Sequence, residues 1–151
     1  MTTHKMIGRC HCNQMTVELA TSLEPHELTL RACQCSFCRR HGARTTSDPA
    51  GALRIVLTNC ESVSYYQFGA LAAEFLVCSR CGVYVAALLR DGDRVYATVN
   101  ANIFDVPLTQ HAEPVDYDRE TPEQRTERRR SMWTPTFIVE NWGTFSERRI
   151  R

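Results

Sequence analysis

The feature that most constrains the fold of this 151-residue chain is the grouping of seven of its eight cysteines. The groups are Cys10-His11-Cys12, the triplet of Cys33, Cys35 and Cys38, and Cys78-Ser79-Arg80-Cys81-Gly82. The eighth, Cys60, stands alone. Thiols at such spacings are typical of tetrahedral zinc sites, for which two pairs supply four ligands and a triplet supplies three. The pattern therefore predicts two metal sites, one closed by the protein and one with an open position.

The two outer cysteine pairs are expected to share one structural zinc ion. Cys78 and Cys81 precede Gly82 in the turn form of a zinc knuckle, where glycine takes a backbone shape that bulkier residues disfavour. Cys10 and Cys12 would point to the same face of an extended strand. Such a site would tie the N-terminus to the middle of the chain. The alternatives are that each pair is simply buried or forms a disulfide.

The central triplet of Cys33, Cys35 and Cys38 is one ligand short of a tetrahedral site. Cys33 and Cys35 would share a face, and Cys38 would return to them through a turn. Three thiolates leave Zn²⁺ with a net charge of about −1, which favours holding a thiolate over making hydroxide. The alternatives are a fourth ligand, such as His41 or Cys60, and a set of reactive thiols with partial or no metal.

The remaining candidate residues carry weaker signals. His11 lies between two predicted ligands and should point away from their metal, and His111 lies in a predicted loop. His41 is a candidate for orienting a ligand or approaching the open position. Cys60 is interpreted as a small core residue.

A local concentration of arginines lies near the C-terminus. It comprises Arg125, Arg128, Arg129 and Arg130, with Arg148, Arg149 and Arg151 at the tail. The pattern predicts a solvated helix face with pairs such as Glu127 and Arg130, three residues apart. Binding of an acidic ligand or a nucleic acid is the alternative.

The composition is that of an ordinary globular domain. Hydrophobic residues make up 43% and charged residues 23%, and no apolar run approaches the roughly 20 residues that span a bilayer. Residues 1–8 contain no apolar segment of the kind found in secretory signals. We therefore expect no membrane partner and a cytoplasmic protein, in which clustered cysteines indicate metal binding or catalysis. Two Zn²⁺ ions on seven thiolates would change the formal charge of +1 to about −2, which gives no case for nucleic acid.

Short apolar segments with a period of two predict a mainly β fold in a single domain, residues 1–151, with a core of about 8–105 and an extension over 106–151. The expected strands cover residues 15–19, 28–32, 53–57, 63–68, 74–77, 83–89 and 94–99. Asp91-Gly92 is a hairpin turn signal between the last two. The sequence does not indicate an oligomeric state.

One surface helix is well marked near the C-terminus. Thr121 supplies an N-cap, Pro122 suits the first helical position, and Gln124 completes a capping box. The helix is expected to run to about Met132. A short strand interrupted at Pro135 should follow it, and residues 105–120 are expected to form a long connection.

The order of these groups resembles the glutathione-dependent formaldehyde-activating enzyme family, which includes centromere protein V. The residues that carry the resemblance are Gly8-Arg-Cys10-His-Cys12, Cys33-Gln-Cys35-Ser-Phe-Cys38-Arg-Arg, Phe75-Leu-Val-Cys78-Ser-Arg-Cys81-Gly82 and, in support, Val99-Asn-Ala-Asn-Ile103-Phe-Asp105. The chain departs from the family pattern at Gln34, where histidine is usual, at Asn13, where glycine is usual, and in its charged C-terminal third.

The resemblance implies an Mss4-like fold, in which coiled antiparallel sheets surround a structural zinc. It assigns that zinc to Cys10, Cys12, Cys78 and Cys81, and a second, functional zinc to Cys33, Cys35 and Cys38 as the catalytic residues. The implied activity is that of a carbon–sulfur lyase joining a small aldehyde and a thiol, as in S-hydroxymethylglutathione formation. A zinc-organised carrier of thiols or other small molecules is the alternative, and a chromatin-associated protein is the third hypothesis.

Overall fold

The fold is described from a computed structural model of the chain and covers residues 2–140. The strands are β1 (His4–Arg9), β2 (Met15–Thr21), β3 (Leu30–Cys33), β4 (Thr45–Thr46), β5 (Ala52–Leu57), β6 (Val63–Tyr66), β7 (Glu74–Cys78), β8 (Tyr84–Asp91), β9 (Arg94–Asn100), β10 (Ala112–Val115) and β11 (Thr134–Glu140). The helices are α1 (Ser36–His41) and α2 (Pro122–Met132), and short 3-10 turns occur at Pro25–Glu27, Cys60–Ser62 and Ala101–Ile103. This architecture confirms the predicted mainly β class with one longer helix near the C-terminus.

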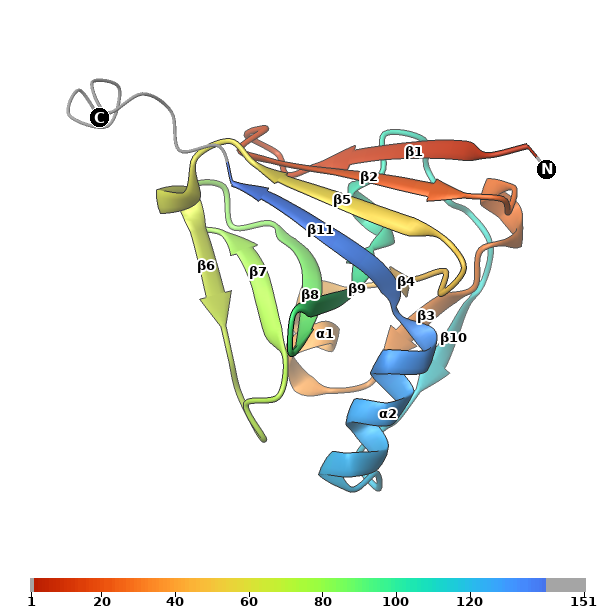
Figure 1. Cartoon of the computed structure of the whole chain (residues 1–151), viewed down its shortest axis with the longest axis vertical. Coiled ribbons are helices and arrows are strands. Elements are labelled where there is room, and N and C mark those ends of the chain that lie inside the picture. Colours follow the sequence, from red (N-terminus) through yellow and green to blue (C-terminus); the bar gives the residue numbers. More distant parts are fainter. Residues whose placement is uncertain (1, 141–151) are drawn as a thin grey trace.

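The strands form one mixed, strongly curled sheet (Figure 1). Its main path runs β1-β2-β5-β11-β9-β4-β3-β10, and β6, β7 and β8 branch from the other edge of β9. In Figure 1, β1, β2, β5 and β11 cross the top of the molecule, while β6–β8 and the β3–β10 pair lie on opposite sides. The curl leaves α1 between these two sides and α2 at the open end.

β11 connects the two halves of the curled sheet. Thr134 and Pro135 pair with β9, whereas residues 136–140 pair in parallel with β5. The expected interruption at Pro135 is wrong, because the strand continues through it. Proline lacks an N–H, and it is tolerated here where the strand changes its pairing partner.

The apolar pattern explains which strands are buried. In β2, Met15, Val17 and Leu19 are fully buried and alternate with half-buried polar residues. β8 is buried continuously from Tyr84 to Leu89, as expected for a strand with both faces covered. All seven strands predicted from periodicity are present, with bounds that shift by at most two residues. Gly92 has a φ of 62° in the β8–β9 turn, as the Asp-Gly signal requires.

Three strands and two parallel pairings were not predicted. One of the three is the two-residue strand β4. β1 pairs with β2 before the first cysteine pair, and β10 lies within the segment expected to be a connection. β10 runs parallel to β3, and β11 runs parallel to β5. β10 contains Pro114 and exposed residues, so its sequence has the weak pattern of an edge strand.

The predicted capping box at the start of α2 is confirmed. The Thr121 hydroxyl accepts from Gln124 N–H at 3.1 Å, and the Gln124 side chain accepts from Thr121 N–H at 2.9 Å. The C-terminal end of α2 contacts the sheet through Ser47, whose hydroxyl donates to Met132 O at 2.8 Å. Within residues 2–140, no helix combines the length and apolarity needed to cross a membrane.

Gly8 is the position in β1 where the sheet tolerates no side chain. A Cβ there would lie 2.8 Å from Ile103 O and 3.0 Å from Ile103 C. We predict that Gly8→Ala lowers the free energy of unfolding by about 1–3 kcal/mol, because the backbone of residue 103 must move. Urea unfolding checks this against Lys5→Ala, an exposed change on the same strand that should cost about 0.5 kcal/mol. Equal stability of the two variants would contradict the prediction.

Candidate functional site

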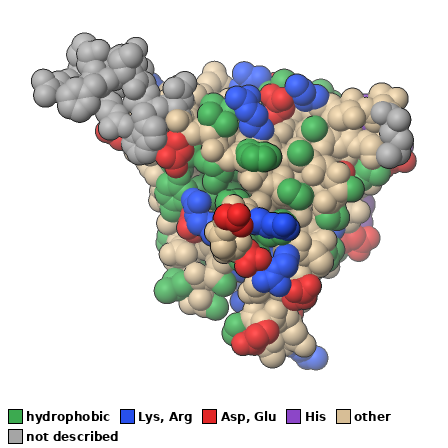
Figure 2. Space-filling view, in the orientation of Figure 1, with side chains coloured by type: hydrophobic (Ala, Val, Ile, Leu, Met, Phe, Trp, Pro, Cys, Tyr) green, Lys and Arg blue, Asp and Glu red, His purple; other side chains and the backbone are tan. Residues whose placement is uncertain are grey.

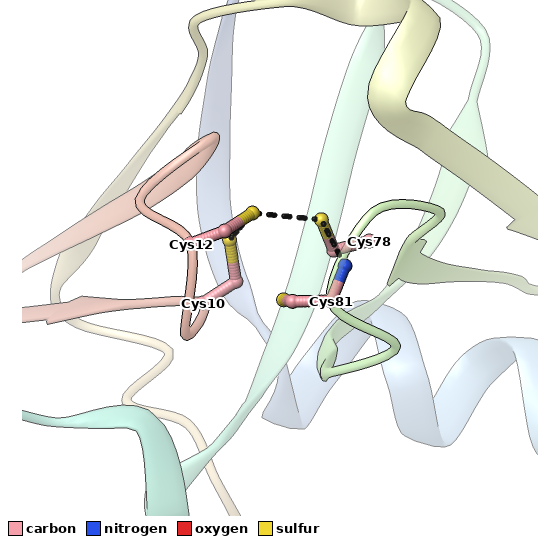
Figure 3. Close-up of side chains that lie close together, drawn as sticks. All are labelled: Cys10, Cys12, Cys78 and Cys81. Atoms are coloured by element: carbon pink, nitrogen blue, oxygen red, sulfur yellow. Dashed lines mark hydrogen bonds between the residues drawn. The ribbon is translucent and has the colours of Figure 1, made fainter.

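Four cysteines from two distant turns meet at one point (Figure 3). Cys10 and Cys12 come from the β1–β2 turn, Cys78 is the last residue of β7, and Cys81 lies in the turn that follows it. Their four sulfurs all lie within 4.8 Å of one another. The Cys12 and Cys78 sulfurs are 3.5 Å apart, and those of Cys10 and Cys12 are 3.8 Å apart. All four cysteines are free, and these separations far exceed a disulfide bond of about 2.05 Å, so the disulfide alternative is wrong.

The spacing of the sulfurs fits a tetrahedral metal site. Four sulfurs bonded to Zn²⁺ at about 2.3 Å would lie about 3.8 Å apart. Backbone N–H groups also point at two of the sulfurs, from Met15 to Cys10 at 3.3 Å and from Cys81 to Cys78 at 3.5 Å. Such N–H groups stabilise thiolates. This cluster can therefore hold a metal ion with protein ligands alone.

Both turns depend on residues in the left-handed backbone region. Gly82 has a φ of 81° and Asn13 a φ of 66°, a conformation that asparagine adopts more readily than most residues. Cys10 and Cys12 thus lie in a turn after β1, and the expectation that they alternate on a strand is wrong. The turn closes with Asn13 N–H donating to Cys10 O at 3.1 Å. His11 is exposed and does not join the sulfur cluster, as expected.

Three thiols of this cluster, those of Cys10, Cys78 and Cys81, have pKa values shifted from that of a free cysteine. Burial raises the pKa of Cys10 and raises the pKa of Cys78 to about 12. Burial also opposes ionisation of Cys81, but hydrogen bonds from the backbone of Val83 and Cys12 and from neighbouring thiols lower its pKa to about 6. Four thiolates this close repel one another, so full ionisation requires a cation among them.

The second cluster lies where β3 ends and α1 begins. Cys33 is the last residue of β3, Cys35 is the N-cap of α1, and Cys38 is buried in its first turn. The Cys35 sulfur accepts from Cys38 N–H at 3.4 Å. The three sulfurs lie within 4.8 Å of one another. The expected turn before Cys38 is thus a short helix.

Within residues 2–140, neither alternative fourth ligand joins the triplet. His41 is exposed and packs on Phe37, with ring centroids 4.5 Å apart. Cys60 is half-buried in a 3-10 turn and belongs to neither cysteine cluster. The triplet is therefore a three-ligand site among the described residues.

Ionisation is unequal within the triplet as well. Hydrogen bonds from the thiols of Cys33 and Cys38, and from the N–H groups of Phe37 and Cys38, lower the pKa of Cys35. The thiols of Cys33 and Cys35 in turn raise the pKa of Cys38. One thiolate is thus favoured, and a divalent cation would be needed to ionise all three.

The triplet opens into a cavity of about 240 Å³. Its walls come from β3, β4, β7, β8, β9 and α2, the loops before β7 and before α2, and all three cysteines. The aromatic side is formed by Phe68, Phe75 and Tyr84. Phe37 packs against this side, with ring centroids 4.7 Å from Phe75 and 5.0 Å from Tyr84. The arrangement is that of a ligand pocket, apolar in part and supplied with a few convergent polar groups.

Tyr84 is the most deeply buried polar residue of this wall, with 1% of its surface exposed. Complete burial, and then the charges of Cys38, Cys33 and Cys35, raise the pKa of Tyr84 well above its ordinary value. Its phenol therefore stays protonated at neutral pH.

The arginines of α2 do not all face solvent, so that expectation is wrong in part. Arg130 is on the outer face and pairs with Glu127 at 2.6 Å and Asp91 at 2.7 Å. Figure 2 shows acidic and basic side chains mixed where α2 approaches the β8–β9 hairpin. Arg125, Arg128 and Arg129 instead line the cavity. Arg148, Arg149 and Arg151 lie outside the described residues.

The comparisons with known proteins agree with this geometry. The family model described as glutathione-dependent formaldehyde-activating enzyme matches residues 5–118. The chain belongs to this family. All three cysteine groups lie within the match, whereas α2 and β11 follow it. The solved structure of a Rhodobacter sphaeroides protein is similar, with a TM-score of 0.55 and 30% sequence identity, covering 73% of this chain and 100% of that one.

Sequence reasoning missed Tyr84 and Arg129 as cavity residues. Tyr84 lies in a continuous apolar run, and Arg129 lies in a polar helix, so neither stands out by its neighbours. Only the distance of Tyr84 from Cys81, three residues along the chain, could have drawn attention to it.

The two clusters should respond differently to loss of a ligand. The four-cysteine cluster joins residues 66 positions apart, whereas the triplet spans one short segment. Because loop-closure entropy rises with loop length, a metal in the first cluster should contribute more to folding. We predict that Cys81→Ser yields unfolded or insoluble protein, whereas Cys35→Ser stays folded and loses one equivalent of metal. Metal quantification together with thermal unfolding checks both, and similar behaviour of the two variants would contradict this division.

Proposed function

We propose that the chain binds two Zn²⁺ ions, a structural one at Cys10, Cys12, Cys78 and Cys81 and a functional one at Cys33, Cys35 and Cys38. We propose further that it joins a thiol such as glutathione to a small aldehyde, as a carbon–sulfur lyase of the formaldehyde-activating type. The protein would work in a reducing compartment such as the cytoplasm, where the thiols remain available as ligands.

The observation that carries the proposal is the position of the three-ligand triplet at the wall of a cavity. When bound there, Zn²⁺ would have one open position at which a substrate thiol can ionise at neutral pH. The protein itself would position the two reactants. The cavity holds the two reactants together and limits their contact with water, which lowers the entropic part of the barrier.

The chemistry is an addition that needs no oxidant and no reductant. The thiol sulfur bonds to the carbonyl carbon, the C=O π bond opens, and the oxygen takes up one proton as the thiol loses one. Negative charge develops on that oxygen, and a donor in the cavity would stabilise it. Tyr84 suits this role, because its phenol is protonated, buried and part of the same cavity wall as the three cysteines.

The reaction can be measured at equilibrium by exchange NMR with ¹³C-formaldehyde and glutathione. We expect the zinc-loaded protein to speed exchange between the free reactants and the hemithioacetal, and Cys35→Ser to return the rate to the uncatalysed value. Stoichiometric binding of thiol or aldehyde without faster exchange would instead identify a carrier, the alternative function.

The role of Tyr84 is tested by removing one oxygen atom. We predict that Tyr84→Phe lowers the exchange rate at saturating substrate by about 100-fold, as loss of one oxyanion donor does elsewhere. Tyr66→Phe is the matched control, since Tyr66 stacks on the same aromatic group but is 48% exposed and does not line the cavity. Metal content and thermal unfolding should match the native protein in both variants. An unchanged rate in Tyr84→Phe would remove the residue from the mechanism.

A further inference from the structure

The cavity beside the triplet has an excess of positive charge. Arg31, Arg125, Arg128 and Arg129 line it, and Asp118 is its one acidic wall residue. The Asp118 side chain is exposed and lies within 4.0 Å of none of these guanidinium groups. The positive charges of these arginines must therefore be balanced by acidic residues outside the cavity wall or by a bound ligand.

Three of the four arginines have partners within the protein. Arg128 donates to both carboxylate oxygens of Glu120 at 2.9–3.1 Å and stacks on Tyr117, 3.5 Å from the ring centroid. Arg125 donates to Tyr117 O at 2.9 Å and lies 3.8 Å from the same glutamate. Arg31 donates to the Ser47 hydroxyl at 3.4 Å. These contacts fix the positions of the three side chains.

Arg129 has no such partner among residues 2–140. Its Nε and Nη1 atoms are buried and make no hydrogen bond. Its guanidinium carbon lies 5.1 Å from the ring centroid of Trp133, which also lines the cavity. Burial, and then the charges of Arg128 and Arg125, lower the pKa of Arg129 to about 10, so the group is still a cation at neutral pH. A half-buried cation with unused donors is costly unless an anion binds to it.

We propose that Arg129 binds the carboxylate of a substrate whose reacting end lies at Cys33, Cys35 and Cys38. The proposal rests on the function proposed above and narrows its substrates to compact molecules that carry an acid group. A guanidinium donates charge-assisted hydrogen bonds to a carboxylate, and Arg129 has its Nε and Nη1 donors unused within residues 2–140. α2 lies beyond the family match of residues 5–118, so this selectivity would come from the chain's C-terminal part.

The carboxylate can belong to the thiol or to the aldehyde, and binding experiments distinguish the two. Trp133 reports on the cavity when Trp142, the other tryptophan, is replaced by phenylalanine in the full-length, zinc-loaded protein. 3-Mercaptopropionate and its methyl ester probe the thiol, and glyoxylate and acetaldehyde probe the aldehyde. We expect the acid of one pair to bind about 10- to 100-fold more tightly than its neutral counterpart, the range for a charged hydrogen bond.

Substitution of Arg129 tests the assignment. Arg129→Met should remove the preference for the acid and leave binding of the neutral probe unchanged, and Arg129→Lys should keep part of it. Arg130→Met is the matched control, since Arg130 pairs outside the cavity with Asp91 and Glu127. Arg129→Met should unfold at the native temperature or above, because it removes an unpaired buried charge. If it does not fold, Arg129→Lys and Arg129→Gln provide the comparison.

Two results would overturn the proposal. The first is equal binding of acid and neutral probes by the native protein, or a preference that survives Arg129→Met. The second is that Arg129→Met loses the metal of the triplet and that the native protein shows no preference for the acid probes. Arg129 would then be a counter-ion for the thiolates rather than a binding residue for the substrate. Selective acid binding without faster thiol–aldehyde exchange would leave the Arg129 site in place and refute only the proposed reaction.

Discussion

The rest of the structure depends on the meeting of the β1–β2 and β7–β8 turns at four sulfurs. β1 and β2 belong to one end of the curled sheet and β7 and β8 to its side branch, so contact between the two turns holds the curl closed. β7 carries Phe75 and β8 begins at Tyr84, three residues after Cys81. The aromatic wall of the cavity is thus built directly onto the four-cysteine cluster. A change in the positions of these four cysteines should therefore also move the residues that line the cavity.

Sequence patterns predicted the parts of this fold that are locally determined. The capping box of α2, the Asp91-Gly92 turn and the alternating strands each depend on a few neighbouring residues, and each is present. β10 and the two parallel pairings depend on which strands meet in space, and no local pattern encodes that. The segment from Cys10 to Cys12 is predicted as a strand but forms a turn, because two cysteines separated by one residue can bring their sulfurs together in either structure. Asn13, which adopts a positive φ, was the residue that distinguished them.

The arginines show where the candidate site exceeded what the sequence could predict. A helix with almost no apolar residues is expected to be solvated on every side, and Arg130 follows that rule. α2 instead lies at the open end of the curled sheet (Figure 1), and its inner face lines the same cavity as the cysteines and the aromatic side chains. Glu120 pairs with Arg128, whereas the neighbouring Arg129 has buried Nε and Nη1 atoms that make no hydrogen bond within residues 2–140. The role of Arg129 in the cavity therefore depends on where α2 packs in the fold and cannot be inferred from the composition of the helix.

The two cysteine clusters differ in connectivity in the way that the proposed division into a structural and a functional metal site requires. The four-cysteine cluster links segments 66 residues apart, so release of its metal would free a long stretch of chain. The triplet lies on the end of β3 and the first turn of α1, which are held by their own backbone hydrogen bonds. A ligand can therefore enter or leave the triplet's open side without the fold having to open. This separation suits the function proposed for Cys33, Cys35 and Cys38, because turnover there would be uncoupled from global stability.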